Sequence, residues 1–257
     1  MARSIALILA SAFLLGPRAV FADEPPPGLL HKVAERENQN ALARADYTYR
    51  QSVTLQEIND LGKVTGEYHT LTDVTFSPTR GRYEQQIGEP VNTLTRLKLT
   101  PEDFTDIRNI NPLLLTTAQV SLYEGQYKGE QVMDGYKCFL EYIRPRQILA
   151  GQRFFEGMLW VRESDFSVVR SEGQSVPQIE TTKSQNLTPH FTTIRQLVDN
   201  KWFFPTETYA DDTLFFRDWP QRVRVIIRYS DYRKFGAEST VTFGEPQTPP
   251  PPPPVKK

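Results

Sequence analysis

The residues that could bind a metal ion are few and lie far apart in the sequence. No two of the three histidines, His31, His69 and His190, fall within one helical turn of each other, and no HExxH motif is present. The only cysteine is Cys138, so the chain cannot supply the paired thiolates of a structural zinc site. The sequence therefore predicts no metal centre and no cofactor.

Patterns that would support nucleophilic or acid–base catalysis are also missing. The sequence has no GxSxG elbow, no P-loop and no dinucleotide fingerprint. The adjacent carboxylates Glu102-Asp103 and Asp211-Asp212 fit a helix start and a turn. Cys138 falls on a predicted inner strand face, where a cysteine generally behaves as a small inert hydrophobe. We therefore expect a protein that is not an enzyme, and a hydrolase is the least favoured alternative.

The charge balance excludes a nucleic-acid-binding surface as the main function. The 257 residues carry 30 Lys and Arg against 31 Asp and Glu, whereas nucleic-acid binding needs a concentrated basic face. Arg222, Arg224 and Arg228 do share one face of a predicted strand. An ordinary solvated face explains them most simply, and a stripe that meets anionic lipid or an acidic partner is the alternative.

The amino end has the pattern of a secretory signal peptide. Arg3 precedes an apolar run, Ile5 to Leu15, and Val20 and Ala22 stand at the −3 and −1 positions before Asp23. The run is too short to span a bilayer of about 30 Å. We expect cleavage near Ala22 and a soluble, exported, periplasmic product. With one cysteine it can form no internal disulfide, so its stability must come from its core.

The rest of the sequence alternates between apolar and polar residues, with a few interruptions. A Pro-rich lead-in at 23–28 precedes a weakly amphipathic helix, Leu29 to Ala45. From Asp46 the period is two, and turn residues divide the chain into about ten strands in hairpin order. One break comes at Thr100 to Leu115, where Thr100 can cap a helix and Pro101 suits its first turn. Its leucine-rich end is either buried core or a mobile plug over a cavity.

The hairpin at Phe154 to Gly173 shows how the strands are built. Phe155, Leu159 and Val161 share one clean apolar face, and Trp160 lies on the other. Four further strands also carry one apolar face, which must be covered by another layer. Because the sequence offers only two helical pieces for that task, the residues indicate a curved sheet, covered by helices, with room for an apolar cavity.

The same hairpin carries a family resemblance. The phrase Gly157-Met158-Leu159-Trp160-Val161, followed by Asp165-Phe166-Ser167-Val168-Val169-Arg170, is similar to a hairpin of the LolA/LolB superfamily, which includes outer-membrane lipoprotein-sorting-like proteins and RseB-type sensor domains. The resemblance covers roughly Leu29 to Phe235. It implies a mainly β (α+β) fold: a half-open, strongly curved antiparallel sheet, an unclosed barrel, with a few helices over the concave face. The missing amino-terminal lipid cysteine departs from the LolB pattern and favours a soluble carrier or sensor.

These observations lead to one functional expectation and one alternative. We expect a single domain at 29–245 that binds or carries a lipophilic ligand, an acyl chain or a lipid-modified protein, in a concave apolar cavity. The alternative is an RseB-like regulatory module with a self-filled core and an envelope protein partner. We also expect a monomer and a disordered Pro-rich tail at 246–257. The predicted ligand-binding residues are Tyr49, Val53, Tyr68, Phe76, Leu140, Tyr142, Leu159, Val161, Val225 and Ile227, with Leu113, Leu114 and Leu115 as the plug.

Overall fold

The structure is a computed structural model of the chain. It describes residues 24–77, 81–113, 115–179, 187, 190–216 and 219–235. The predicted signal peptide, the predicted Pro-rich tail and Leu114 of the predicted plug lie outside the described residues.

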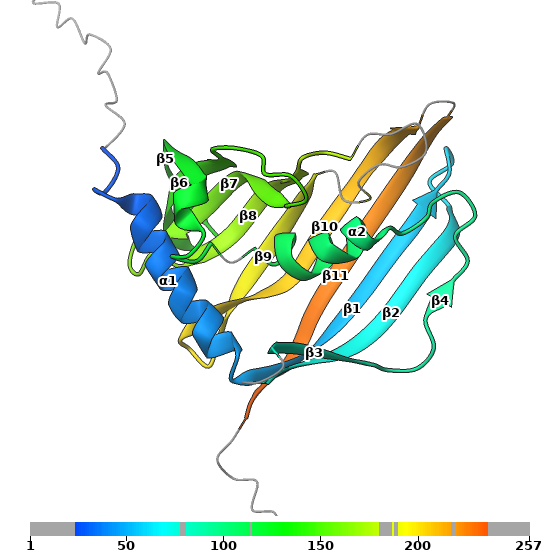
Figure 1. Cartoon of the computed structure of the whole chain (residues 1–257), viewed down its shortest axis with the longest axis horizontal. Helices are drawn as coiled ribbons and strands as arrows, with labels where there is room; N and C mark the ends of the chain where they lie inside the picture. The colour runs from blue at the N-terminus through cyan, green and yellow to red at the C-terminus, as the bar shows by residue number, and fades with distance from the viewer. Residues whose placement is uncertain are drawn as a thin grey trace, which may run out of the picture.

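One large antiparallel sheet organises the described part of the chain (Figure 1). Ten of its eleven strands follow the order β3-β2-β1-β11-β10-β9-β8-β7-β6-β5, and the eleventh, β4, pairs with β2 outside this order. The two ends of this order, β3 and β5, are not paired with each other, so the sheet is not closed into a barrel. The strands are β1 (Tyr47–Ile58), β2 (Val64–Ser77), β3 (Gly81–Gln86), β4 (Val91–Asn92), β5 (Tyr123–Met133), β6 (Tyr136–Pro145), β7 (Phe154–Arg162), β8 (Val168–Val176), β9 (Phe191–Val198), β10 (Trp202–Phe216) and β11 (Trp219–Lys234).

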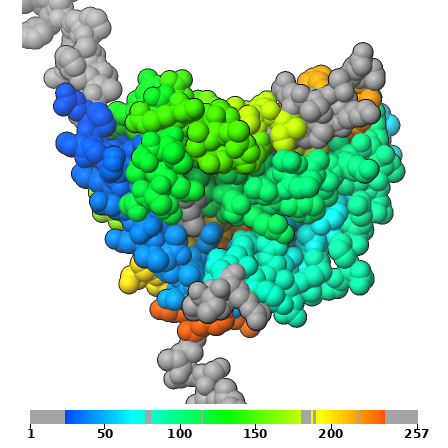
Figure 2. Space-filling model, in the orientation of Figure 1, coloured from blue at the N-terminus to red at the C-terminus, as the bar shows by residue number. Residues whose placement is uncertain are grey.

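The helical segments lie in front of the sheet in Figure 1, across its concave side, and in the space-filling view of Figure 2 the blue α1 and the green segments around α2 form the near surface. They are α1 (Leu29–Arg44), α2 (Pro101–Thr105), a single π-helical turn η1 (Asp106–Ile110) and a 3₁₀ turn η2 (Val120–Leu122). The predicted fold class, a half-open curved antiparallel sheet with a few helices over its concave face, is therefore confirmed.

Local sequence explains why these elements form where they do. Along β1 every second residue from Tyr47 to Glu57 is buried, as period-two alternation predicts for a strand with one covered face. At α2 the Thr100 hydroxyl accepts from the backbone N–H of Asp103, and the Asp103 carboxylate accepts from the backbone N–H of Thr100. This capping box satisfies two otherwise free donors, and Pro101 fits the first turn that follows it. The predicted helix thus begins as expected, but its α-helical part ends at Thr105.

The core lies between the concave face of the sheet and these covering segments. Buried residues of β1, β7 and β11 form one continuous cluster with Leu29 and Val33 of α1 and with Ile107 and Ile110 of η1. The hairpin of β7 and β8 contributes Phe155, Leu159 and Val161 to this core, as predicted, while Trp160 lies on the opposite face.

The predicted orientation of β6 is wrong. Leu140 and Tyr142 face away from the core, where they pair with Trp160 and Met158 of β7. Phe139 and Ile143 face the core instead. Both faces of β6 are rich in apolar residues, so alternation alone does not distinguish inside from outside, and only the pairing with β7 decides.

Cys138 is buried, but in a second, smaller cluster with Val169 and Phe203. Burial is the main reason that the pKa of its thiol rises to about 11, with a smaller contribution from the charge of Glu163. The thiol therefore stays protonated and chemically inert at neutral pH.

Candidate functional site: the covered concave face

A cavity opens where the covering segments meet the β5–β7 side of the sheet. It has a volume of about 600 Å³. Among the described residues its wall combines apolar side chains with arginines and amides and includes no carboxylate, although Glu84 and Asp106 pair with Arg108 and Arg153 beside it. Such a site suits a chain-like apolar molecule with a polar or anionic end. Its main lining residues are Arg44, Arg108, Asn109, Ile110, Leu113, Gln119, Leu122, Tyr123, Arg153 and Phe154.

This cavity is continuous with the hydrophobic core. Ile110, Leu113, Tyr123 and Phe154 belong both to the cavity wall and to the buried cluster on the concave face. Of the segment from Ile110 to Leu115, Ile110 and Leu113 thus line the cavity, and Leu115 is buried in the core.

A buried ion pair holds this segment in place. Glu37 of α1 and Arg195 of β9 lie 2.6 Å apart, and both side chains are completely buried. Asn40 donates to the second carboxylate oxygen of Glu37 at 2.9 Å, and Arg195 also donates to the backbone carbonyl of Leu113. One arginine thus connects the helix, the sheet and the segment that bounds the cavity.

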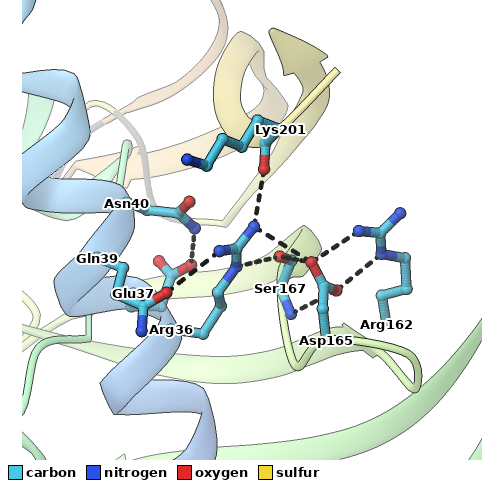
Figure 3. A network of polar contacts seen from close by, with 8 residues as sticks. All are labelled: Arg36, Glu37, Gln39, Asn40, Arg162, Asp165, Ser167 and Lys201. Atoms are coloured by element: carbon cyan, nitrogen blue, oxygen red, sulfur yellow. Dashed lines mark hydrogen bonds and ion pairs between the residues drawn. The ribbon is translucent and has the colours of Figure 1, made fainter. Parts of the chain in front are cut away.

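A second polar network fastens α1 to two turns at the end of the sheet (Figure 3). Arg36 donates to the Ser167 hydroxyl at 2.9 Å and to the Lys201 carbonyl at 2.8 Å. Asp165 lies between two arginines, 3.2 Å from Arg36 and 2.6 Å from Arg162. Burial alone would raise the pKa of the Asp165 carboxyl, but hydrogen bonds from Arg162 and Ser167 lower it below its usual value. The acidic turn after β7 is thus the anchor of α1.

A third contact fixes η1. Asp106 forms an ion pair with Arg153 at 2.5 Å, and their side chains are 1% and 9% exposed. Asp103, one turn earlier, accepts from the backbone N–H of Leu187 at 3.1 Å. Burial raises the pKa of the Asp103 carboxyl although its hydrogen bonds act in the opposite direction. Together with Arg195, these contacts attach the covering segments at points far apart along the chain.

The structure brings most of the predicted ligand-binding residues together. Tyr49, Val53, Leu159, Val161, Val225, Ile227, Leu113 and Leu115 lie in the one buried cluster, and Tyr68 and Phe76 pack against its edge. The same cluster contains Leu29 and Val33 of α1 and Ile107 and Ile110 of η1, so the protein's own side chains cover this face. Leu140 and Tyr142 lie on the other face of the sheet and do not belong to this group.

The charged residues of the site were not singled out from the sequence, although two of them left a signal. Glu37 falls within the apolar stripe of α1, and Arg195 shares a strand face with Phe191 and Thr193. A charged residue on a helix or strand face whose other residues are buried indicates that it has a buried partner of opposite charge. Asp106 and Arg153 left no such signal, because neither belongs to a periodic face.

The described ranges contain neither a helix that could cross a membrane nor a cluster that could hold a metal ion. No helix there is long and apolar enough to cross a membrane. No group of three or more His, Cys, Asp or Glu side chains in this part of the chain is placed to hold a metal ion.

The chain is similar in structure to several solved proteins. A DUF1329 family protein from Desulfovibrio piger matches 84% of this chain and 96% of its own, with a TM-score of 0.40 and 15% identity. A putative outer membrane lipoprotein-sorting protein domain from Vibrio parahaemolyticus matches 82% and 93%, with a TM-score of 0.39 and 10% identity. A LolA superfamily protein from Nitrosomonas europaea matches 77% and 93%, with a TM-score of 0.31 and 15% identity. No protein-family model and no curated protein matches the sequence.

Proposed function

We propose that this protein is exported to the periplasm and binds a lipophilic ligand, an acyl chain or a lipid-modified protein, between its curved sheet and the segments that cover it. One observation supports this most directly: the cavity of about 600 Å³ shares Ile110, Leu113 and Phe154 with the hydrophobic core. An acyl chain that enters there passes from water onto apolar surface, which is worth about 0.8 kcal/mol for each methylene buried. Binding of this kind needs no cofactor and no covalent step.

In this proposal the segment around Leu113 and Leu115 acts as the plug. It moves outward when the ligand enters, and the contact given up is the hydrogen bond from Arg195 to the Leu113 carbonyl. The ligand then lies against the concave face, on residues such as Leu159, Val161 and Val225 that are buried under the covering segments. The polar end of the ligand stays at the cavity mouth, near Arg108 and Arg153.

Uptake of a fluorescent fatty acid by the full chain tests the proposal, together with native mass spectrometry of protein purified from a cell envelope. Val225→Phe adds bulk to the concave face, whereas Ile226→Phe adds the same ring to the opposite face of the same strand. We expect Val225→Phe to reduce uptake at least tenfold and Ile226→Phe to leave it unchanged. A wild-type protein with neither co-purified lipid nor uptake contradicts the proposal.

One observation favours a second function, a regulatory module that binds an envelope protein on its outside. The concave face is already covered by side chains of α1 and η1, so its core is filled by the protein itself. In that case a folded Val225→Phe variant still captures the partner that the wild-type chain captures. Neither the variant nor the wild type then takes up lipid.

A further inference from the structure

The outer face of the sheet carries a groove that the proposed function does not use. It crosses β6, β7 and β8 and has a volume of about 510 Å³. Leu140, Tyr142, Met158 and Trp160 supply its apolar surface, and Glu156 and Glu172 flank them. The lining contributed by described residues includes no lysine or arginine, but Arg170 lies next to it and forms an ion pair with Glu172 at 3.1 Å. An extended, apolar segment that carries positive charge fits this combination of aromatic surface and carboxylates.

The groove is pre-organised for such a segment. The Trp160 indole N–H donates to Gln131 at 3.0 Å, and the Arg170 guanidinium lies 5.3 Å from the centre of the Trp160 ring, so the ring is held in place. Glu172 forms an ion pair with Arg170 at 3.1 Å, and Glu156 accepts from the Tyr142 hydroxyl at 2.5 Å. Because an ionised carboxylate has about four acceptor positions, each of the two retains capacity for a lysine.

We propose that this groove binds residues 248–257 of the same chain. Their sequence is Thr-Pro-Pro-Pro-Pro-Pro-Pro-Val-Lys-Lys. A proline run favours the extended polyproline II conformation, which aromatic grooves recognise at a low cost in conformational entropy. Lys256 and Lys257 supply the positive charge that complements Glu156 and Glu172.

Residues 236–247 are long enough to connect the end of β11 to the groove on β7. The described residues stop at Phe235, just after β11, and β7 lies four strands away from β11 in the sheet order. Four inter-strand spacings amount to about 19 Å. Residues 236–247 span about 37 Å when extended at about 3.1 Å per residue.

The end of the sheet from which the segment reaches the groove also agrees with the order of its residues. Tyr47 pairs with Lys234 near the end of β11 and donates to Asp199 in the β9–β10 turn at 2.5 Å. Arg36 in turn joins Lys201 of that turn to Ser167 of the β7–β8 turn, so these chain positions share one end of the sheet (Figure 3). A segment that enters the groove from this end meets Trp160 before Glu156 and Glu172. This matches the order within residues 248–257, in which the prolines precede the lysines.

Zero-length carbodiimide cross-linking of the full chain tests the proposal, because it joins a lysine to a carboxylate only on contact. Glu207 is the matched control: its side chain is 38% exposed against 36% for Glu172, it lies on the outer face, and β10 is adjacent to β11. We expect Lys256 and Lys257 to link to Glu156 and Glu172 at least five times more often than to Glu207, within a single chain. Equal linking to Glu172 and Glu207 overturns the proposal.

Two sets of variants separate docking from simple charge attraction. Replacement of Pro250, Pro252 and Pro254 by serine leaves the described domain intact and is expected to lower linking at Glu172 to the level of Glu207. Trp160→Ala should do the same, whereas Tyr209→Ala, on the outer face of β10, should not. Linking that survives the proline replacements overturns recognition by the aromatic groove. Linking found only between two chains, and rising with protein concentration, assigns the groove to a second copy and overturns the intramolecular form.

Discussion

The carboxylate of Glu37 on α1 lies 2.6 Å from the guanidinium of Arg195 on β9, and neither side chain is exposed. The same guanidinium donates to the Leu113 carbonyl, so the pair connects α1, β9 and the segment at Leu113. Two buried charges are costly to desolvate and are tolerated only when each has its partners. Removal of one member therefore leaves the other as a buried charge without its partner, and this lowers the stability of the folded protein.

Removal of one partner should destabilise the protein strongly. We expect Arg195→Met or Glu37→Leu to lower the free energy of unfolding by about 3–5 kcal/mol, because each leaves an uncompensated buried charge. The double variant Glu37→Leu with Arg195→Met should recover most of this loss. Urea denaturation of the four proteins gives the coupling energy, and additive effects in that cycle contradict a direct interaction.

The anchor at Asp165 should control α1 locally. Asp165→Asn weakens its contacts with Arg36 and Arg162, so we expect amide hydrogen exchange in α1 to accelerate several-fold while β1 and β11 keep their protection. Asp211→Asn is the matched control, since Asp211 also bridges two arginines, Arg222 and Arg224, but on the outer face. Faster exchange in α1 after Asp211→Asn as well would show that the effect is not local.

Glu141 should make stability depend on pH. Its side chain is 5% exposed, one carboxylate oxygen finds no hydrogen-bond partner among the described residues, and burial raises its pKa to about 7. The folded state thus binds this proton more tightly than the unfolded state does. The associated stability is complete below about pH 4.5 and is lost as the pH rises through about 7.

Glu141→Gln removes this dependence. At pH 8 the variant should be more stable than the wild type by about 3–4 kcal/mol, because the rise of the pKa from 4.5 to about 7 is worth about 1.4 kcal/mol per pKa unit, and at pH 4 the two should match. Glu57 should show the opposite dependence of stability on pH. Burial would raise the pKa of its carboxyl, yet hydrogen bonds from the backbone N–H groups of Leu97, Arg96 and Thr95 lower that pKa. Glu57→Gln should therefore destabilise the protein at pH 7 and lose that effect as the pH falls. Denaturation curves at both pH values check the two signs.

Gly157 is required by close packing between β7 and β8. A Cβ at this position would lie 2.2 Å from the Glu172 carbonyl oxygen and 2.8 Å from the Phe155 ring. We expect Gly157→Ala to cost at least about 2 kcal/mol, because backbone must move to relieve the overlap. Ser171→Ala, on the partner strand, is the control: the buried hydroxyl has no hydrogen-bond partner among the described residues, so its removal should be close to neutral. A thermal shift assay compares the two.

Local sequence patterns determined most of the strands and the start of α2. Period-two alternation is a property of a few consecutive residues, and so is a capping box at Thr100 and Asp103. Both are formed by neighbours in the chain, so the sequence alone was enough to place them.

Three features depended on the tertiary structure. The outward face of β6 follows from its pairing with β7, because apolar residues stand on both sides of that strand. Glu37 and Arg195 are 158 positions apart, and nothing in the sequence states that they meet. The position of Leu113 over the core depends on Arg195, which donates to its carbonyl, and on Glu37, which pairs with Arg195. Alternation fixes which residues share a face, but only the long-range register and the burial of charge decide which face is covered and by what.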